Sequence, residues 1–566
     1  MAGIETSRPL KVHVKSLGGG GKSDWKWRSS ELFASGWIIN AKTRSLVWEM
    51  TTGNTRKSSD GRSCDEWISL EPGAYEVYFA APVFSHNSWA THVVVNVDHR
   101  KKPLFGNHDG DGWFKGWFTE DFPEAWEKLA KEWGIDILVN DGDVSSVKQF
   151  SAPRKLPNIA FQAIGLGEGE IIRQGIAIRE PVSMDVYAIG EKPGNGDLAD
   201  FGWMVNANTR ERVWEMTPRN TRKAGGAEKN TMLRASIRLD KGDYVLYFVT
   251  DDSHSSIDWN SPPPYDPTNW GVTLSLDRAA ETEMVKTFQY REGMNVIAEI
   301  TRPGDDENRQ ESFSLKEPVQ ARVYAFGERS NSKRTMADFG YILDARTREK
   351  VWTMDIDRCH HAGGGSKNLY VDEVIPLRKG SYVLIYKTDD SHSYNDWNDD
   401  PPFDEEHYGI TLLGVGKGFK SNVVVKVDDD REKGVIALVV RVGNDASASD
   451  KFRLDKPTRV RVYAIGEGQQ RTMYDYGWIE NVKSGAIVWE MTYGMSFHAG
   501  GGRKNRMVNT TILLEKGEYV LRHVSDDSHS YGDWNDDPPD DPQYWGITLF
   551  EEGADNGLPP PPPPKP

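Results

Sequence analysis

Three loops rich in aspartate, asparagine, serine and histidine carry the residues best suited to chemistry in this chain. Each contains Asp-Asp-Ser-His-Ser, beginning at residues 251, 389 and 526, and then Asp-Trp-Asn. A hard cation such as Ca²⁺ prefers several carboxylate and amide oxygens at one point, and closely spaced carboxylates repel one another without it. The predicted Ca²⁺ ligands are Asp251, Asp252, Asp258, Asn260, Asp389, Asp390, Asp396, Asn398, Asp526, Asp527, Asp533 and Asn535.

The same loops also have a structural interpretation. Asp, Asn and Ser bond their own backbone in turns, and the prolines that follow each loop stiffen it. In this interpretation Trp259, Trp397 and Trp534 plug the end of the fold. In a further alternative the same tryptophans are exposed platforms that bind a carbohydrate. Solvent exposure of Trp534 separates the two alternatives.

A second recurring loop is rich in glycine and carries histidine. It begins at His361 in one copy and at His498 in the next, and an earlier copy has Lys223 instead. Two histidines and an aspartate form a Zn²⁺ set, so His498 near His529 would suit zinc. Zinc is less favoured than calcium, because the copy with Lys223 lacks the first histidine. The candidate binding histidines are His254, His392, His529, His361 and His498.

These loops belong to a repeat that runs through the chain. Val-Trp-Glu-Met occurs at 47–50, 213–216 and 488–491, and Val-Trp-Thr-Met occurs at 351–354. The last three tryptophans follow one another at intervals of 138 and 137 residues, which is long enough for each copy to have its own core. The predicted organisation is repeat 1 (8–98), an insertion (99–156), repeat 2 (157–278), repeat 3 (294–416), repeat 4 (433–552) and a proline-rich tail (553–566).

Within each repeat the pattern predicts β-strands. Arg459–Ala464 alternates polar and apolar residues, which is the period of a half-buried strand. The turn at Asn481–Gly485 predicts one hairpin, and the turn at Glu515–Gly517 predicts a second. Many short strands without helices indicate an all-β fold of four tandem antiparallel β-sandwich modules of the jelly-roll kind.

The insertion breaks this pattern. Residues 121–133 predict a helix, with Trp126, Leu129 and Trp133 on one face. An alternative function follows from it: a hydrolase whose active site lies in residues 99–150, with the sandwiches as accessories.

Composition excludes several classes of protein. A formal net charge of −16 argues against nucleic-acid binding, and no apolar run is long enough for a membrane span. The first residues show no signal peptide, so the sequence as written predicts a cytoplasmic start. The alternative is the cell surface or the extracellular space, if the chain is trimmed or exported by another route. The two cysteines fall in different repeats, so a disulfide framework is not expected.

The run Leu-x-x-Gly-x-Tyr-x-Leu at 377–384 and 514–521 resembles the prepeptidase C-terminal β-sandwich modules of secreted bacterial hydrolases. That resemblance implies accessory, non-catalytic modules, often extracellular and sometimes metal-bound. The absent signal peptide and the long Asp-rich loop depart from it. Together these observations predict a non-enzymatic, multivalent binding or scaffolding protein. Its expected partner is a protein or polysaccharide surface, or a second copy of the chain.

Overall fold

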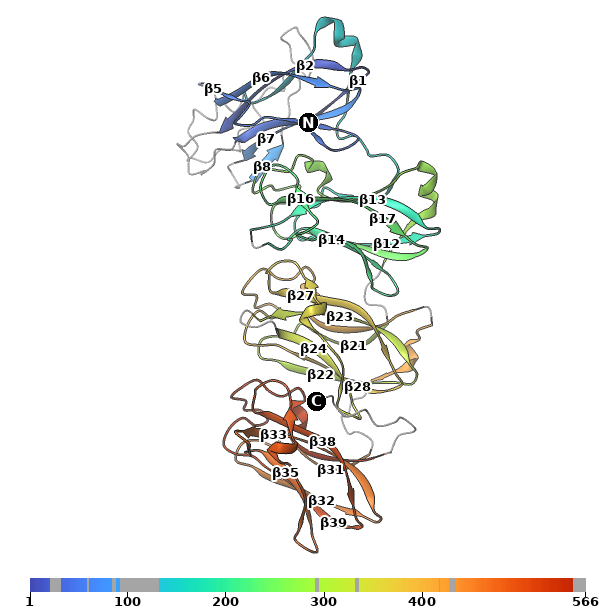
Figure 1. Ribbon diagram of the computed structural model, residues 1–566, viewed down its shortest axis with the longest axis vertical. Helices are drawn as coiled ribbons and strands as arrows, with labels where there is room; N and C mark the ends of the chain where they lie inside the picture. The colour runs from blue at the N-terminus through green and yellow to red at the C-terminus, as the bar shows by residue number, and fades with distance from the viewer. Residues whose placement is uncertain are drawn as a thin grey trace. The chain divides into compact units, whose positions relative to one another are not determined.

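The computed structural model describes residues 1–20, 32–58, 61–83, 88–91, 132–194, 196–290, 295–330, 335–416, 418–426 and 434–552. The chain is all-β, and its strands pair antiparallel, as predicted (Figure 1). It divides into two compact units, Met1–Val427 and Asp428–Pro566. The predicted helix at 121–133 lies outside the described residues except for its last two. Trp133 is buried and directly precedes a strand.

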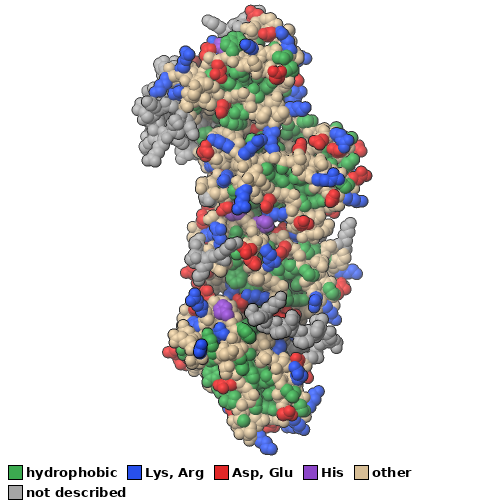
Figure 2. All heavy atoms as spheres, viewed as in Figure 1, with side chains coloured by type: hydrophobic (Ala, Val, Ile, Leu, Met, Phe, Trp, Pro, Cys, Tyr) green, Lys and Arg blue, Asp and Glu red, His purple; other side chains and the backbone are tan. Residues whose placement is uncertain are grey.

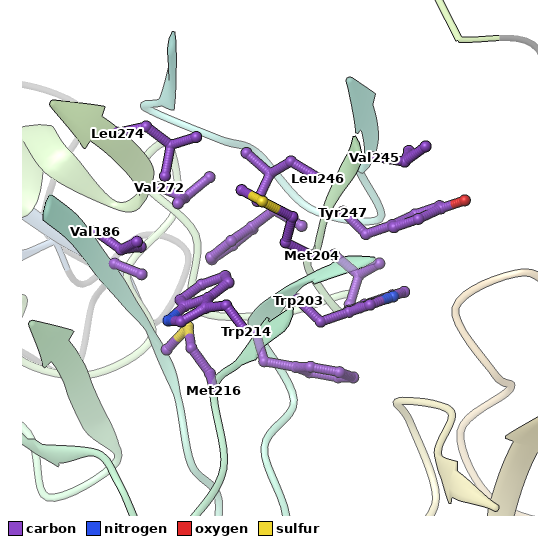
Figure 3. Packing of buried hydrophobic residues seen from close by; sticks show 14 of the residues in the cluster. Val186, Trp203, Met204, Trp214, Met216, Val245, Leu246, Tyr247, Val272 and Leu274 are labelled. Atoms are coloured by element: carbon purple, nitrogen blue, oxygen red, sulfur yellow. The ribbon is translucent and has the colours of Figure 1, made fainter. Parts of the chain in front are cut away.

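Repeat 2 is built from two five-stranded sheets, ordered β11-β19-β13-β17-β16 and β15-β14-β18-β12-β20. Figure 3 shows Val186, Val272 and Leu274 on one side of the core and Met204 and Leu246 facing them from β14 and β18. The strands are β11 (Ile159–Ile164), β12 (Ile171–Ile178), β13 (Val182–Glu191), β14 (Phe201–Asn206), β15 (Arg212–Glu215), β16 (Arg222–Lys223), β17 (Asn230–Leu239), β18 (Gly242–Val249), β19 (Gly271–Leu276) and β20 (Val285–Phe288), with 3₁₀ turns η2 (Pro267–Asn269) and η3 (Ala279–Met284).

Repeat 3 repeats this pairing pattern. Its strands connect into one ten-stranded sheet because β23 also pairs with β24 through Glu328 and Asp338. They are β21 (Val296–Thr301), β22 (Asn308–Leu315), β23 (Val319–Arg329), β24 (Met336–Asp344), β25 (Lys350–Thr353), β26 (His360–His361), β27 (Asn368–Leu377), β28 (Gly380–Lys387), β29 (Gly409–Gly414) and β30 (Val424–Lys426), with 3₁₀ turns η4 (Ile356–Arg358), η5 (Glu405–His407) and η6 (Ser421–Val423).

Repeat 4 belongs to the second unit and has a six-stranded and a four-stranded sheet. The hairpin around Asn481–Gly485 is confirmed, since β35 pairs with β36. The second predicted hairpin is wrong, because β38 and β39 pair with strands of opposite sheets. The strands are β31 (Val435–Val440), β32 (Ser447–Leu454), β33 (Thr458–Gln469), β34 (Thr472–Met473), β35 (Tyr476–Asn481), β36 (Ile487–Glu490), β37 (Phe497–His498), β38 (Asn505–Leu514), β39 (Gly517–Val524) and β40 (Gly546–Glu551), with 3₁₀ turns η7 (Tyr493–Met495) and η8 (Pro542–Tyr544).

Repeat 1 extends beyond the predicted 8–98. β9 pairs with β2 as β19 pairs with β13, so the closing strand of repeat 1 follows the insertion. The insertion therefore stands where the other repeats have their Asp-rich loop. The strands are β1 (Ala2–Thr6), β2 (Leu10–Gly20), β3 (Leu32–Asn40), β4 (Leu46–Glu49), β5 (Arg56–Ser58), β6 (Gly61–Leu70), β7 (Gly73–Val83), β8 (Ser88–Thr91), β9 (Gly134–Leu138) and β10 (Val147–Phe150), with 3₁₀ turn η1 (Asp141–Ser146).

Repeats 2 and 3 also run beyond their predicted limits. β20 lies after residue 278 and pairs with β12, and β30 lies after residue 416 and pairs with β22. None of the helices in the described part is long and apolar enough to cross a membrane. Figure 2 shows acidic and basic side chains interspersed over the visible face.

Candidate cation sites

Repeats 2, 3 and 4 each bring three carboxylates together. In each group, one carboxylate oxygen from every residue lies within 4.8 Å of the other two. The three groups, called here the acidic triads, are Glu191, Asp200 and Asp251; Glu328, Asp338 and Asp389; and Glu467, Asp475 and Asp526. In each triad the Glu and the first Asp are buried, and the second Asp is half-buried.

The sheet geometry places each triad at the same point. The Glu lies near the C-terminal end of the long strand β13, β23 or β33, and the buried Asp lies at or near the start of β14, β24 or β35. The residue before each Glu is glycine, and at Gly327 a Cβ would approach the carbonyl oxygen of Asp338 to 2.2 Å. Any larger residue would push the buried Asp away, so this glycine lets the two chain segments meet.

The buried Asp of each triad anchors the loop that carries the third carboxylate. Asp338 Oδ1 accepts a hydrogen bond from the backbone N–H of Asp389 at 2.8 Å, and its Oδ2 accepts from Tyr408 Oη at 2.6 Å. Asp200 and Asp475 make the same bond to the backbone of Asp251 and Asp526, both at 2.9 Å. The anchor is therefore the same in three copies.

Burial and mutual repulsion make these carboxylates hard to ionise. Burial raises the pKa of Glu191 to about 7 and that of Asp251 to about 6, and neighbouring aspartates add to both shifts. Burial also raises the pKa of Asp475 to about 7, and that of Asp338 well above its usual range. A nearby cation would restore their ionised form.

One lysine partly neutralises each triad. Lys229 and Lys367 approach Glu191 and Glu328 at 2.9 Å, and Lys504 approaches Glu467 at 3.2 Å. One ammonium opposes three carboxylates, so each site keeps an excess of negative charge when all three are ionised.

Each triad contains a buried oxygen that has no hydrogen-bond partner among the described residues. It is the Oε2 atom of Glu191, Glu328 and Glu467, whose residues are 3%, 3% and 6% exposed. Asp305 Oδ1 and Asn444 Oδ1 are orphaned in the same way beside two of the triads. The oxygens of an ionised carboxylate only accept hydrogen bonds, and an unsatisfied buried acceptor costs about 1–3 kcal/mol. Repetition of the same orphan in three copies points to a ligand that the acceptor binds.

A fourth oxygen-bearing residue lies next to each triad. The residue that follows it in the chain donates its backbone N–H to the backbone carbonyl of the half-buried Asp of the triad. These bonds run from Gly169 to Asp251 at 2.7 Å, from Asp306 to Asp389 at 2.7 Å and from Asp445 to Asp526 at 2.6 Å. The fourth residues are therefore Glu168, Asp305 and Asn444. Their charge differs between copies, because the last is a neutral amide.

Of the twelve predicted ligands, Asp251, Asp389 and Asp526 fall in the triads. The other nine are exposed and lie outside them: Asp252, Asp258, Asn260, Asp390, Asp396, Asn398, Asp527, Asp533 and Asn535. The amides have other roles, since Asn398 and Asn535 accept from Lys367 and Lys504. Within the loop, the aspartates at 258, 396 and 533 follow a tight turn.

The loop histidines are structural hubs. His254, His392 and His529 are fully buried, adopt positive φ angles of 57°, 59° and 52°, and contact Asn230, Asn368 and Asn505 at 2.6, 2.5 and 2.5 Å. Asn230 Nδ2 donates to the carbonyls of Gly225 and Pro262, both at 2.8 Å, so it joins the glycine-rich loop to the Asp-rich loop. Burial lowers the pKa of His254 to about 3, which keeps the ring neutral.

The three loop tryptophans that were predicted to bind a ligand are buried or half-buried. Trp259 is 3% exposed, and Trp397 and Trp534 are half-buried. Trp534 packs edge-on against Trp545 at 5.0 Å and against His529 at 5.2 Å, which favours the plug over the carbohydrate platform.

The two histidines of the glycine-rich loops do not complete a metal site with the loop histidines. His361 is half-buried and stacks on Phe201 at 6.1 Å, whereas His498 is exposed and contacts the carbonyl of Gly502 at 3.1 Å. The groups of potential metal ligands found in the described part of the chain contain carboxylates and no histidine.

Sequence reasoning missed the Glu and the buried Asp of each triad, because they lie far from the loop in the chain. The signal was present: Gly-Glu recurs at 190–191, 327–328 and 466–467, and Asp-aromatic-Gly recurs at 200–202, 338–340 and 475–477. Repeat 1 has neither, and Gly19 pairs with Ala34 at the corresponding place. The triad is therefore specific to the three repeats that also have the Asp-rich loop.

Comparison of the chain with protein-family models and with curated protein sequences found no match. The fold and the triads define an all-β protein with recurring carboxylate clusters. The resemblance to prepeptidase C-terminal modules stays a prediction.

Proposed function

We propose that this chain is a non-enzymatic, multivalent binding or scaffolding protein with one Ca²⁺ bound at each acidic triad. The observation that carries the proposal is the orphaned Glu oxygen that recurs beside two further carboxylates in three copies. A single such group would be weak support. Three equivalent groups with the same anchor indicate selection for a common ligand.

The donor set fits calcium in kind. Ca²⁺ takes six to eight oxygens in flexible geometry, from carboxylates, amides, carbonyls and water. Each site offers the three triad carboxylates, and Asp305 or Asn444 adds an oxygen in repeats 3 and 4. Zinc is a poorer fit, because it favours nitrogen and sulfur donors.

A scaffold is the role that the repetition suits best. Three sites that each bind a partner weakly act together on one chain. When the partner carries several matching groups, the effective concentration at the second and third sites is raised. The partner proposed here is a protein or polysaccharide surface that the Ca²⁺-loaded loops contact. The hydrolase alternative concerns residues 99–150, most of which lie outside the described part of the chain.

Titration of the full chain with Ca²⁺ tests the proposal. We expect isothermal titration calorimetry to give three equivalents, and Ca²⁺ to raise the melting temperature of the chelator-treated protein, because a ligand that binds only the folded state stabilises it. Terbium luminescence would report the same three sites, sensitised by the aromatic residues that donate to the buried Asp of each triad: Trp270, Tyr408 and Trp545. Melting curves that are identical with Ca²⁺ and with chelator would overturn the proposal.

The fourth residue predicts that the three sites differ in affinity. Asn444 should make repeat 4 the weakest, because affinity for Ca²⁺ rises with the number of charged ligands. Replacing Asn444 with Asp should strengthen that site about tenfold, and Asp305→Asn should weaken repeat 3 by a similar factor, on the order of the effects of changed metal-site partners. Calorimetry on the two single variants gives the comparison. Affinities unchanged from those of the parent chain in both variants would show that this residue does not contact the ion.

A further inference from the structure

An arginine occupies the same strained turn position in three of the repeats. Arg44, Arg210 and Arg348 have φ angles of 53°, 61° and 58°, and repeat 4 has Gly485 there with φ 66°. The turn is otherwise the same, since Arg44 N–H donates to Asn40 at 2.8 Å and Gly485 N–H donates to Asn481 at 2.8 Å. Glycine adopts this conformation freely, and an L-residue pays for it. The turn alone therefore does not explain the arginines.

Arg44 crosses from repeat 1 into repeat 2. Its Nε donates to Asp266 Oδ2 at 2.8 Å, and its Nη1 donates to Glu76 Oε1 at 2.7 Å. The side chains of Arg44, Glu76 and Asp266 are 2%, 0% and 3% exposed. Tyr187 of repeat 2 also donates to Asp266, at 3.0 Å. The guanidinium is thus buried between two carboxylates, one from each repeat.

Arg210 also crosses from repeat 2 into repeat 3, where its carboxylate partner lies on β27 and not before a 3₁₀ turn as Asp266 does. Its Nε lies 3.0 Å from both carboxylate oxygens of Asp372, and its side chain is fully buried. Arg322 binds the same carboxylate at 2.6 and 2.9 Å, and Tyr290 Oη accepts from both guanidinium groups. The two arginines hold the pKa of Asp372 well below its usual range despite its burial.

Aromatic residues surround each crossing. Trp37 of repeat 1 donates Nε1–H to the Tyr265 carbonyl of repeat 2 at 2.6 Å. Trp203 of repeat 2 packs on Tyr370 and Phe403 of repeat 3, with ring centroids 5.8 and 5.2 Å apart. Figure 3 shows Trp203 and Tyr247 pointing away from Val186 and Val272. Strands β14 and β18 therefore carry apolar side chains on both of their faces.

We propose that the arginine in the left-handed backbone conformation docks its own repeat onto the next one. It inserts into the next repeat, and its clamp holds repeats 1 to 3 together as one cooperative unit instead of independent beads. The interface fits another repeat of the same chain. That repeat supplies a buried carboxylate, together with an aromatic ring or the backbone carbonyl of an aromatic residue. This inference goes beyond cation binding and does not depend on it.

The corresponding face of repeat 4 has lost this device. Gly485 replaces the arginine, and Glu480 and Arg522 stand where repeat 2 has Val205 and Tyr247. Glu480 and Arg522 pair at 3.1 Å and keep side-chain exposures of 30% and 37%. This charged pair lies beside Trp478 and the exposed Ile487 on the same face. Charged residues on an outer face are typical of a capping repeat. We therefore expect this face not to capture a second copy of the chain through the clamp.

Replacement of Arg210 with Gly in the full chain tests the clamp. Glycine fits the turn, as Gly485 does, and Asp372 keeps Arg322 as a partner, so neither strain nor an abandoned carboxylate can explain a loss. We expect proteolytic cleavage between repeats 2 and 3 to become about tenfold faster, since removing one partner of a buried pair opens the interface. The calorimetric transition of the first unit should also split.

Matched variants complete the experiment. Arg219→Gly removes an exposed arginine from the same repeat and should leave cleavage unchanged. Asp372→Asn should accelerate cleavage as Arg210→Gly does, and the double variant should add little to either. Arg210→Gly protein with unchanged cleavage and an unsplit transition would overturn the proposal, as would independent, additive effects of the two single variants.

Discussion

Asparagine in place of Asp389 is expected to remove one of the three Ca²⁺ sites while leaving the loop folded. The Oδ1 atom of Asp389 accepts from the Ser391 N–H at 3.1 Å, and an asparagine oxygen keeps that bond. The substitution removes the charge of Asp389, which is one of three carboxylates in the triad with Glu328 and Asp338. Calorimetry should show two strong sites instead of three, with the third weakened by about 100-fold, as expected for loss of a charged ligand.

The matched control is Asp390→Asn, which changes the next residue of the same string. Asp390 is exposed and lies outside the triad, so this variant should keep three strong sites. Asp389→Asn should also not destabilise the calcium-free protein, because burial raises the pKa of Asp389 and its charge is unfavourable there. If Asp390→Asn lost the site and Asp389→Asn kept it, the ion would lie in the exposed part of the loop.

The contrast between these two aspartates shows what local sequence can and cannot give. Asp389 and Asp390 are indistinguishable in the string, and only the pairing of Glu328 with Asp338 across β23 and β24 decides which of them meets other carboxylates. Those two residues lie more than 50 positions upstream of the loop. The repeat predicts that the loop matters, but ligand geometry depends on long-range strand contacts.

The fold was predictable where the pattern is local. Period-2 alternation predicts strands such as β33, and the turn at Asn481–Gly485 predicts the β35–β36 hairpin. The turn at Glu515–Gly517 has similar residues, yet β38 and β39 enter opposite sheets. The residues of a turn determine that the chain reverses direction. The burial of Leu514 and Tyr519 determines with which strand each of the two flanking strands pairs. A separate core for each repeat was also expected, whereas Met1–Val427 is one compact unit, in which Tyr370 and Tyr408 of repeat 3 join the core cluster of repeat 2.

A buried histidine in repeat 4 gives the second large expected effect. His523 on β39 is fully buried. Neither ring nitrogen makes a hydrogen bond of good geometry within the described residues, although the backbone of Ile465 lies close enough to interact with the ring. It faces Gly477, as Phe79, Phe248 and Tyr386 face the corresponding glycines. An unsatisfied buried polar group costs about 1–3 kcal/mol. His523→Phe should therefore stabilise repeat 4 by about 2 kcal/mol at neutral pH, measured by denaturant unfolding.

The same substitution should reduce the pH dependence of stability. Burial lowers the pKa of His523 to about 4 from its usual 6.5, so the folded state keeps the ring neutral while the unfolded state protonates it. Stability is then full above pH 6.5 and falls as the pH drops toward 4, by up to about 3 kcal/mol. His523→Phe should reduce this slope between pH 6.5 and 4 by about half, because burial also lowers the pKa of His529 in the same repeat to about 4. The exposed His498, changed to Phe, should leave the slope in place. A slope that persists unchanged in the His523 variant would assign it to other groups. The carboxylates whose pKa burial raises are not among them, because their protonation on acidification stabilises the fold and acts in the opposite direction.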